Sequence, residues 1–120
     1  MSDLVASSGR ERAAKVAATA ATLAHGWDRL PARELVRLHT ALEDHARSYN
    51  DWLAGITGTG VEHVHHVRGV VSTIATIAAL LEDAEDVAVR RRLAEMLQRG
   101  AHNLVVSVDA ASRVRRAPRS

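Results

Sequence analysis

Apolar side chains recur at alternating steps of three and four residues along most of this chain, which is the spacing of one face of an α-helix. Four such segments are evident, at residues 9–25, 32–54, 61–81 and 87–114. The cleanest run comprises Leu35, Leu38, Leu42, His45, Tyr49, Trp52 and Ile56. Gly26, the glycine-rich stretch 55–60 and the acidic stretch 82–86 separate the segments, since glycine tolerates turns that end helices. The pattern predicts an all-α fold, an antiparallel four-helix bundle made of two helical hairpins.

The breaks also predict how the chain is organised. Residues 9–54 are expected to form an N-terminal helical hairpin and residues 61–115 a second hairpin, joined by the glycine-rich turn. Residues 1–8 are expected to be a disordered N-terminus, and residues 116–120 a basic tail. Gly100 lies in the middle of the last helix, where glycine costs about 1 kcal/mol relative to alanine, so a close helix crossing is expected there.

Composition narrows the function classes. The chain has no cysteine, which excludes disulfides and thiolate metal sites and fits a reducing compartment. No apolar run has the length of a membrane span, and the N-terminus has no signal-peptide core, so a cytoplasmic location is expected. Alanine-rich helices bury little area each, so a homodimer paired through the 61–115 hairpins is expected to complete or extend the core.

Charge adds little to this picture. The formal net charge is +2. The arginines between residues 113 and 119 account for this excess, and such a tail is more typical of a solvated terminus than of a nucleic-acid site. Walker lysine, nucleophile-elbow serine, Rossmann glycines and paired catalytic carboxylates are all missing from the sequence. We predict no cofactor.

The segment 61–81, VEHVHHVRGVVSTIATIAALL, joins an apolar seam to a histidine cluster. The seam is formed by Val67, Val70, Ile74, Ile77 and Leu81. In this heptad frame His65 takes an outward-facing position, whereas His63 falls on the seam. A neutral, exposed imidazole on a rigid helix can act as a nucleophile toward phosphorus.

The run from His65 through His66, Val67, Arg68 and Gly69 to Ile74 resembles the phosphoacceptor box of sensor histidine kinases. The resemblance continues through the acidic turn and the last helix and covers residues 61–117. It implies a kinase-dimerisation and histidine-phosphotransfer hairpin of the HisKA type, typical of bacterial two-component signalling. It further implies that His65 accepts the phosphoryl group, that Arg68 neutralises its charge, and that a histidine kinase or response regulator is the partner.

Two positions depart from that family. His66 replaces the acid that follows the phosphoacceptor, and Val70 stands where proline is usual. The sequence shows no ATP-binding domain after the hairpin, so we expect the protein to be at most a phosphotransfer protein that receives its phosphoryl group from elsewhere, and whether it is an enzyme stays open.

Two alternatives also remain. The chain could be a non-catalytic helical interaction or scaffold protein that binds a kinase or regulator without accepting phosphate. The Glu62-x-x-His65 spacing, with His63 and His66 one turn apart, also occurs in metal-binding bundles, and His45 could add a ligand. A metal site of that type needs a second motif, which a symmetric dimer could supply.

Overall fold

The computed structural model describes the backbone of residues 2–55 and 61–116, and the side chains of residues 9–55 and 66–108. Its backbone forms four helices: α1 (Ser2–Gly26), α2 (Ala32–Ala54), α3 (Val61–Asp83) and α4 (Val87–Arg116). The described backbone contains no strand, so the prediction of an all-α bundle is confirmed.

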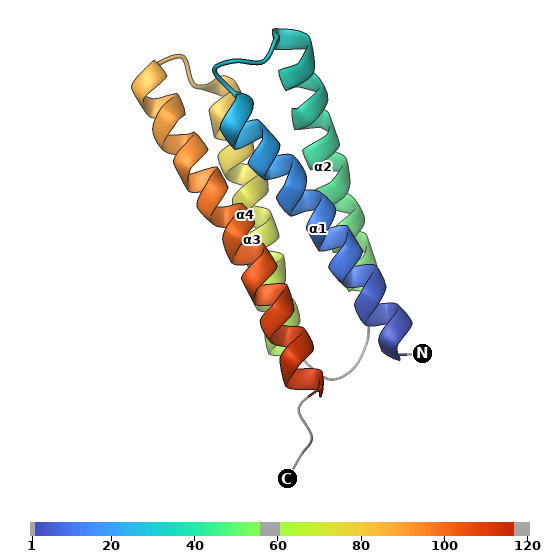
Figure 1. Ribbon diagram of the computed structural model, residues 1–120. Helices are drawn as coiled ribbons and strands as arrows, with labels where there is room; N and C mark the ends of the chain where they lie inside the picture. The colour runs from blue at the N-terminus through green and yellow to red at the C-terminus, as the bar shows by residue number, and fades with distance from the viewer. Residues whose placement is uncertain (1, 56–60, 117–120) are drawn as a thin grey trace.

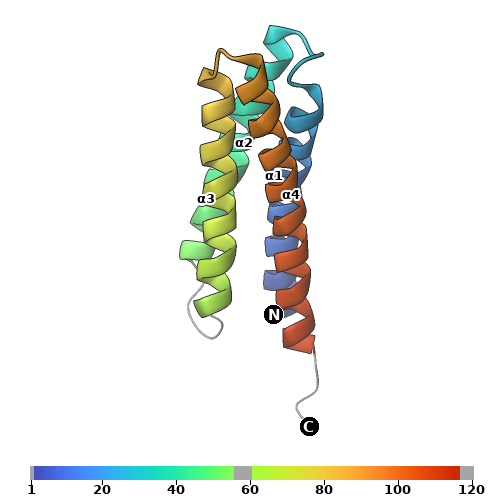
Figure 2. The ribbon, with the colours of Figure 1, turned by 90° about the vertical axis from the view of Figure 1, so that its left-hand side faces the viewer.

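The helices run alternately up and down and form a closed ring in chain order (Figure 1). Helix α1 packs against α2 and α4, and α3 packs against α4 and α2, whereas α1 and α3 meet only across the diagonal. Figure 2 shows α3 and α4 side by side on one side of the bundle. The molecule is therefore elongated, with principal extents of 52 × 23 × 18 Å.

The core consists of the helix faces that the apolar spacing predicts, together with buried alanines beside them. Val16, Ala20 and Leu23 of α1 are fully buried, and Leu42 and Leu97 bring α2 and α4 to the same core. Other buried members of this cluster are Ala13, Ala17, Ala24, Ala46, Tyr49, Leu53, Val71, Ala78, Ala101 and Leu104. Small alanine faces allow the helices to approach closely, which is why one chain of this length closes a continuous core.

The seam of α3 is covered within a single chain. Ile74 is 0% exposed and Leu81 is 1% exposed, and the buried Val71 widens the seam beyond the heptad positions. Dimerisation was expected because this seam needed a cover. Helices α1, α2 and α4 supply that cover, so the uncovered-seam argument for a dimer does not hold.

Helix α1 begins at Ser2, earlier than the start at residue 9 that the sequence suggested. The backbone of residues 2–8 is thus part of α1 and not a disordered lead-in. No proline or glycine interrupts this stretch before Gly9, so nothing local stops the helix from extending.

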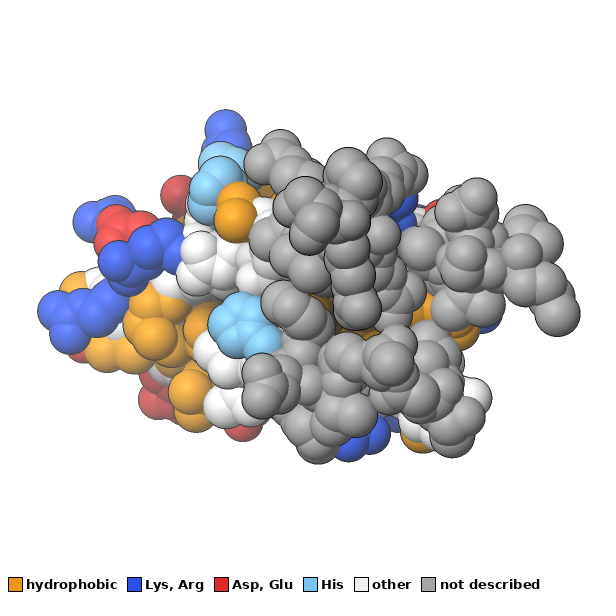
Figure 3. Space-filling view, turned by 90° about the horizontal axis from the view of Figure 1, so that it is seen from below, with side chains coloured by type: hydrophobic (Ala, Val, Ile, Leu, Met, Phe, Trp, Pro, Cys, Tyr) orange, Lys and Arg blue, Asp and Glu red, His pale blue; other side chains and the backbone are white. Residues whose placement is uncertain are grey.

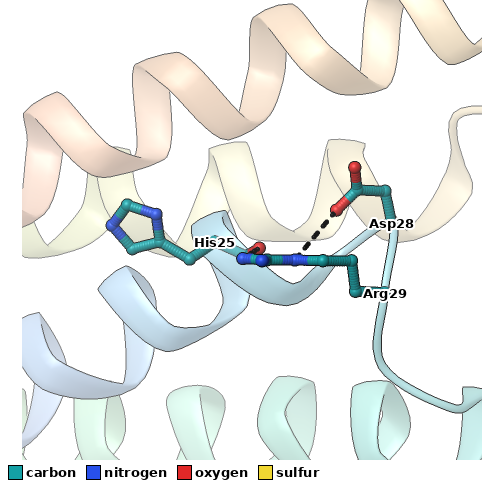
Figure 4. A network of polar contacts seen from close by, with 3 residues as sticks. All are labelled: His25, Asp28 and Arg29. Carbon is teal, nitrogen blue, oxygen red and sulfur yellow. Dashed lines mark hydrogen bonds and ion pairs between the residues drawn. The ribbon is translucent and has the colours of Figure 1, made fainter.

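The turn between α1 and α2 follows Gly26, where the break was expected. The Gly26 backbone is not in the left-handed region; instead, a Cβ at Gly26 would lie 2.8 Å from Cγ of Leu30, which folds back over the helix end. Asp28 does not cap α2, whose N-cap is Pro31 without a side-chain hydrogen bond. Figure 4 shows Asp28 with Arg29, whose Nε lies 3.9 Å from Asp28 Oδ1 and whose Nη2 donates to the His25 carbonyl at 2.7 Å.

The turn between α3 and α4 ends in a side-chain cap. The Oδ1 atom of Asp86 accepts hydrogen bonds from the backbone N–H groups of Ala88, at 2.8 Å, and Val89, at 3.3 Å. These bonds satisfy two of the donors that a helix start leaves unpaired. The predicted break at 82–86 is therefore explained by an N-cap as well as by its acidic composition.

Within the described chain, no helix is both long enough and apolar enough to cross a membrane.

Candidate functional site

The outward strip of α3 is the structural setting of the predicted phosphoacceptor. Arg68, Gly69 and Ser72 are all exposed and follow one another along the side of α3 that faces away from the core. Position 65 lies on the backbone of α3, and at 3.6 residues per turn it continues the same strip by one turn. The His65 side chain lies outside the described residues, so its outward-facing position stays a prediction.

His66 is directed toward the neighbouring helix. Its ring is exposed, and Nε2 lies 3.2 Å from Oγ of Ser107 on α4. Adjacent residues of a helix diverge by about 100°, so a ring that reaches α4 is directed away from the outward strip. His66 therefore links α3 to α4 near the end of the bundle where α3 begins. Sequence reasoning did not identify Ser107 as its partner.

Arg68 lies one turn from position 65, at the i+3 spacing that brings helical side chains together. Its guanidinium is exposed, and no ion pair involving it occurs among the described residues. The side chain therefore has donors available to an anion that approaches the strip.

Gly69 and Gly100 occupy helix interiors for different reasons. A Cβ at Gly100 would lie 3.0 Å from Cγ1 of the fully buried Ile74, so this glycine allows α3 and α4 to approach closely, as the sequence predicted. A Cβ at Gly69 would meet nothing within 4 Å. Packing of the chain against itself therefore does not require a glycine at position 69, although glycine there weakens the helix.

No metal centre is visible in the described part of the chain, where no group of three or more His, Asp or Glu side chains could hold an ion. Glu62, His63 and His65, on which the metal alternative depended, have side chains outside the described residues. The remaining histidines of that proposal do not converge, because His66 contacts Ser107 whereas His45 lies between α1 and α2.

Described residues line two hollows elsewhere on the bundle, and neither was predicted from the sequence. One, of about 170 Å³, lies between α1 and α2 and is lined by Glu11, Arg12, Lys15, His45 and Ser48. The other, of about 410 Å³, lies between the end of α1 and α4. Its lining residues are Ala24, His25, Trp27, Arg91, Ala94, Glu95, Gln98 and Arg99.

Helices α3 and α4 also expose apolar side chains. Leu80 is 53% exposed, Val89 46% and Met96 38%, and Val105 and Val106 are exposed farther along α4. Seen from below, hydrophobic side chains gather at the left of the molecule among basic and acidic side chains, on the side where α3 and α4 lie in Figure 1 (Figure 3). This surface is open to contact with another protein.

Comparison with known proteins finds no matching protein family, no similar curated protein and no similar solved structure.

Proposed function

We propose that this protein is a stand-alone histidine phosphotransfer module that accepts a phosphoryl group on His65. The observation that supports this most directly is the combination of Arg68 and Gly69 on the outward strip of α3. A cation that forms no ion pair with any described residue, and a position without a side chain, lie next to position 65 on the side that faces away from the core. A phosphoryl donor therefore has both an electrostatic partner and room to approach.

Gly69 gives this proposal its structural argument. At an exposed and uncrowded position within a helix, alanine is more stabilising than glycine by about 1 kcal/mol. Packing does not account for the glycine, since a Cβ at position 69 would lie in open space. A partner that covers the strip during transfer does account for it, because a side chain one turn from His65 would stand between the two proteins.

In this mechanism a neutral ring nitrogen of His65 attacks phosphorus, a nitrogen–phosphorus bond forms and the bond from phosphorus to the donor oxygen breaks. Arg68 offsets the negative charge that spreads over the phosphoryl oxygens. The ring proton of His65 must pass to a base. His66 is directed toward Ser107, so we assign that role to the partner protein or to water.

The partners that fit this chemistry are a histidine kinase or a response regulator, within a bacterial two-component phosphorelay in the cytoplasm. We also propose a homodimer, but not because the α3 seam needs a cover, since the chain itself covers that seam. The apolar groups at Leu80, Val89 and Met96 offer an area that a second copy could cover.

A second function is favoured by the same exposed apolar side chains and by the direction of His66. In it the chain is a non-catalytic scaffold that binds a kinase or regulator through α3 and α4 and accepts no phosphate. Apolar groups on paired helices suit docking of a partner whether or not transfer follows. The two functions therefore share a surface and differ in the chemistry at position 65.

The experiment that separates them is incubation with small phosphoryl donors and with histidine kinases from the same cell, followed by detection of acid-labile phosphate. Phosphotransfer predicts label on His65, located by peptide mass spectrometry at neutral pH. Partner binding without any label, across all donors, would establish the scaffold instead.

A further inference from the structure

The pocket between α1 and α2 is lined entirely by polar and charged side chains. Arg12 and Lys15 of α1 face His45 and Ser48 of α2 across about 170 Å³. Glu11 is the single acid of the lining, against two permanent cations and a histidine. The pocket lies on the hairpin of α1 and α2, whereas position 65 lies on α3 (Figure 1).

Arg12 and Ser48 are held in place across the pocket. The half-buried guanidinium of Arg12 donates a hydrogen bond from Nη1 to Oγ of Ser48, which ties the two helices together. The Ser48 hydroxyl accepts this bond and keeps its own hydrogen, so it can still donate to a ligand. A donor fixed in this way loses little side-chain freedom when a ligand binds.

Lys15 and His45 complete the lining. Neither takes part in any ion pair or hydrogen bond within the described portion of the molecule. Lys15 is also the one lysine in a chain whose other basic residues are fifteen arginines and seven histidines. Lysine carries a compact charge with three donors, which suits a small oxyanion that is approached from several sides.

The size of the pocket limits the ligand. A volume of about 170 Å³ is several times the roughly 30 Å³ that one water occupies, yet smaller than the roughly 300–1,000 Å³ of a pocket for drug-sized molecules. We propose that the pocket formed by Arg12, Lys15, His45 and Ser48 is a binding site for a phosphate-sized oxyanion, either inorganic phosphate or the phosphoryl group of a small monoester. The site is independent of phosphotransfer at His65.

The single lysine allows a direct test. Full-length protein is treated with an amine-acylating reagent, with and without inorganic phosphate, at a constant ionic strength of about 0.1 M so that screening does not change. Modification of Lys15 is then read by peptide mass spectrometry. The proposal predicts that phosphate slows acylation of Lys15 several-fold and in a saturable manner, because the bound anion holds the ammonium group.

The Arg37→Lys variant supplies a matched control. Arg37 lies on the same hairpin, its side chain is 70% exposed, and it is not part of the pocket lining. A lysine at position 37 should react at the same rate with and without phosphate. Equal slowing at both lysines, or no slowing at Lys15, overturns the proposal.

Substitutions in the lining test the individual contacts. Ser48→Ala and His45→Ala each remove one donor, and each should raise the phosphate concentration needed to protect Lys15 by about tenfold or less. Glu11→Gln removes the opposing carboxylate and should lower that concentration. Protection that is unchanged by Ser48→Ala and His45→Ala together, or that is weakened by Glu11→Gln, contradicts the proposal.

A comparison of ligands identifies the source of the anion. Glycerol phosphate tested beside inorganic phosphate distinguishes a site that admits a monoester from one that admits the free ion alone, and either result supports an oxyanion site. Circular dichroism of every variant confirms that α1 and α2 remain folded, so that a loss of protection is a loss of binding.

Discussion

The Cγ1 atom of Ile74 lies 3.0 Å from where a Cβ on Gly100 would be, and this contact fixes how closely α3 and α4 pack. Ile74 is fully buried, so it has little space into which to move. Gly100→Val should therefore destabilise the protein by about 1–3 kcal/mol, despite the higher helix propensity of valine. Chemical denaturation monitored by circular dichroism gives this value.

Gly69→Ala is the matched substitution with the opposite expected sign. A Cβ at Gly69 meets nothing within 4 Å, so the gain in helix propensity is not offset and should stabilise the protein by about 1 kcal/mol. The bulky Gly69→Leu should fold equally well, yet it should slow phosphotransfer to position 65. A Gly69→Ala protein that is less stable than wild type would mean that the glycine has a packing role after all.

The contrast between these glycines shows what the sequence could and could not predict. The step of three and four residues predicted the helices and much of the core, and a mid-helix glycine at 100 predicted a close crossing. The alanines at 13, 17 and 101 are buried too, but alanine is also common on exposed helix faces, so the pattern alone did not select them. Apolar spacing along one segment does not say which helix covers it, so the sequence could not show that the chain's own α1, α2 and α4 cover the seam of α3.

The candidate site was predictable only in part, for a similar reason. The spacing within α3 predicted that Arg68 lies one helical turn from position 65. The contact of His66 with Ser107, and the pocket that Lys15 and His45 both line, bring together residues that are far apart in sequence. Such contacts depend on which helices are neighbours in the ring and on their register, and neither follows from local periodicity.

Tyr49 provides a test of core burial at high pH. The side chain is 4% exposed, and burial raises the pKa of Tyr49 to about 12 from an ordinary value of 10.0. A group whose pKa is raised on folding stabilises the folded protein at pH values below its unfolded pKa. This contribution to stability is lost as the pH rises, here between about 10 and 12. Because Tyr49 is the only tyrosine, near-ultraviolet absorbance reports its ionisation alone. Tyr49→Phe should remove this part of the alkaline loss of stability, and an absorbance transition centred near pH 10 in folded protein would contradict the prediction.

His39 provides the corresponding test at acid pH, at the contact of α2 with α3. Its Nδ1 lies 3.7 Å from Oε2 of Glu82. Burial lowers the pKa of His39 below 6.5, although Glu82 and Glu43 oppose the shift and Arg90 adds to it. The unfolded chain therefore binds the proton more readily, and stability should fall as pH decreases from about 6.5.

The variants at this contact have opposite expected effects. His39→Gln should flatten the decline in stability below pH 6.5, because the titrating group is gone. Glu82→Gln should make the decline steeper, since the carboxylate that favours the charged ring is removed. Denaturation midpoints of the wild type and both variants, measured from neutral to mildly acid pH, test these expectations. If the wild type and the His39→Gln variant decline in parallel, His39 does not contribute to acid sensitivity.

The histidine pair on α3 is the test of chemistry. His65→Gln should abolish phosphoryl transfer and leave the melting temperature nearly unchanged, because position 65 shares the outward strip of α3 with Arg68 and Ser72. Arg68→Ala should slow transfer without preventing it, since one cation supplies only part of the charge stabilisation. His66→Glu places a carboxylate where the resembled family has an acid, and should raise the rate if that carboxylate can reach the ring proton of His65.

Ser107→Ala is the control that interprets this last variant. It breaks the contact of His66 with α4 while leaving position 66 a histidine. If a freed His66 can serve as a base, Ser107→Ala should also raise the rate; if only a carboxylate serves, the gain should be confined to His66→Glu. The scaffold hypothesis predicts that all these proteins, like the wild type, carry no acid-labile phosphate and still bind the partner. Wild-type protein that stays unlabelled with every kinase of its own cell, together with no gain from His66→Glu, would rule out phosphotransfer at His65.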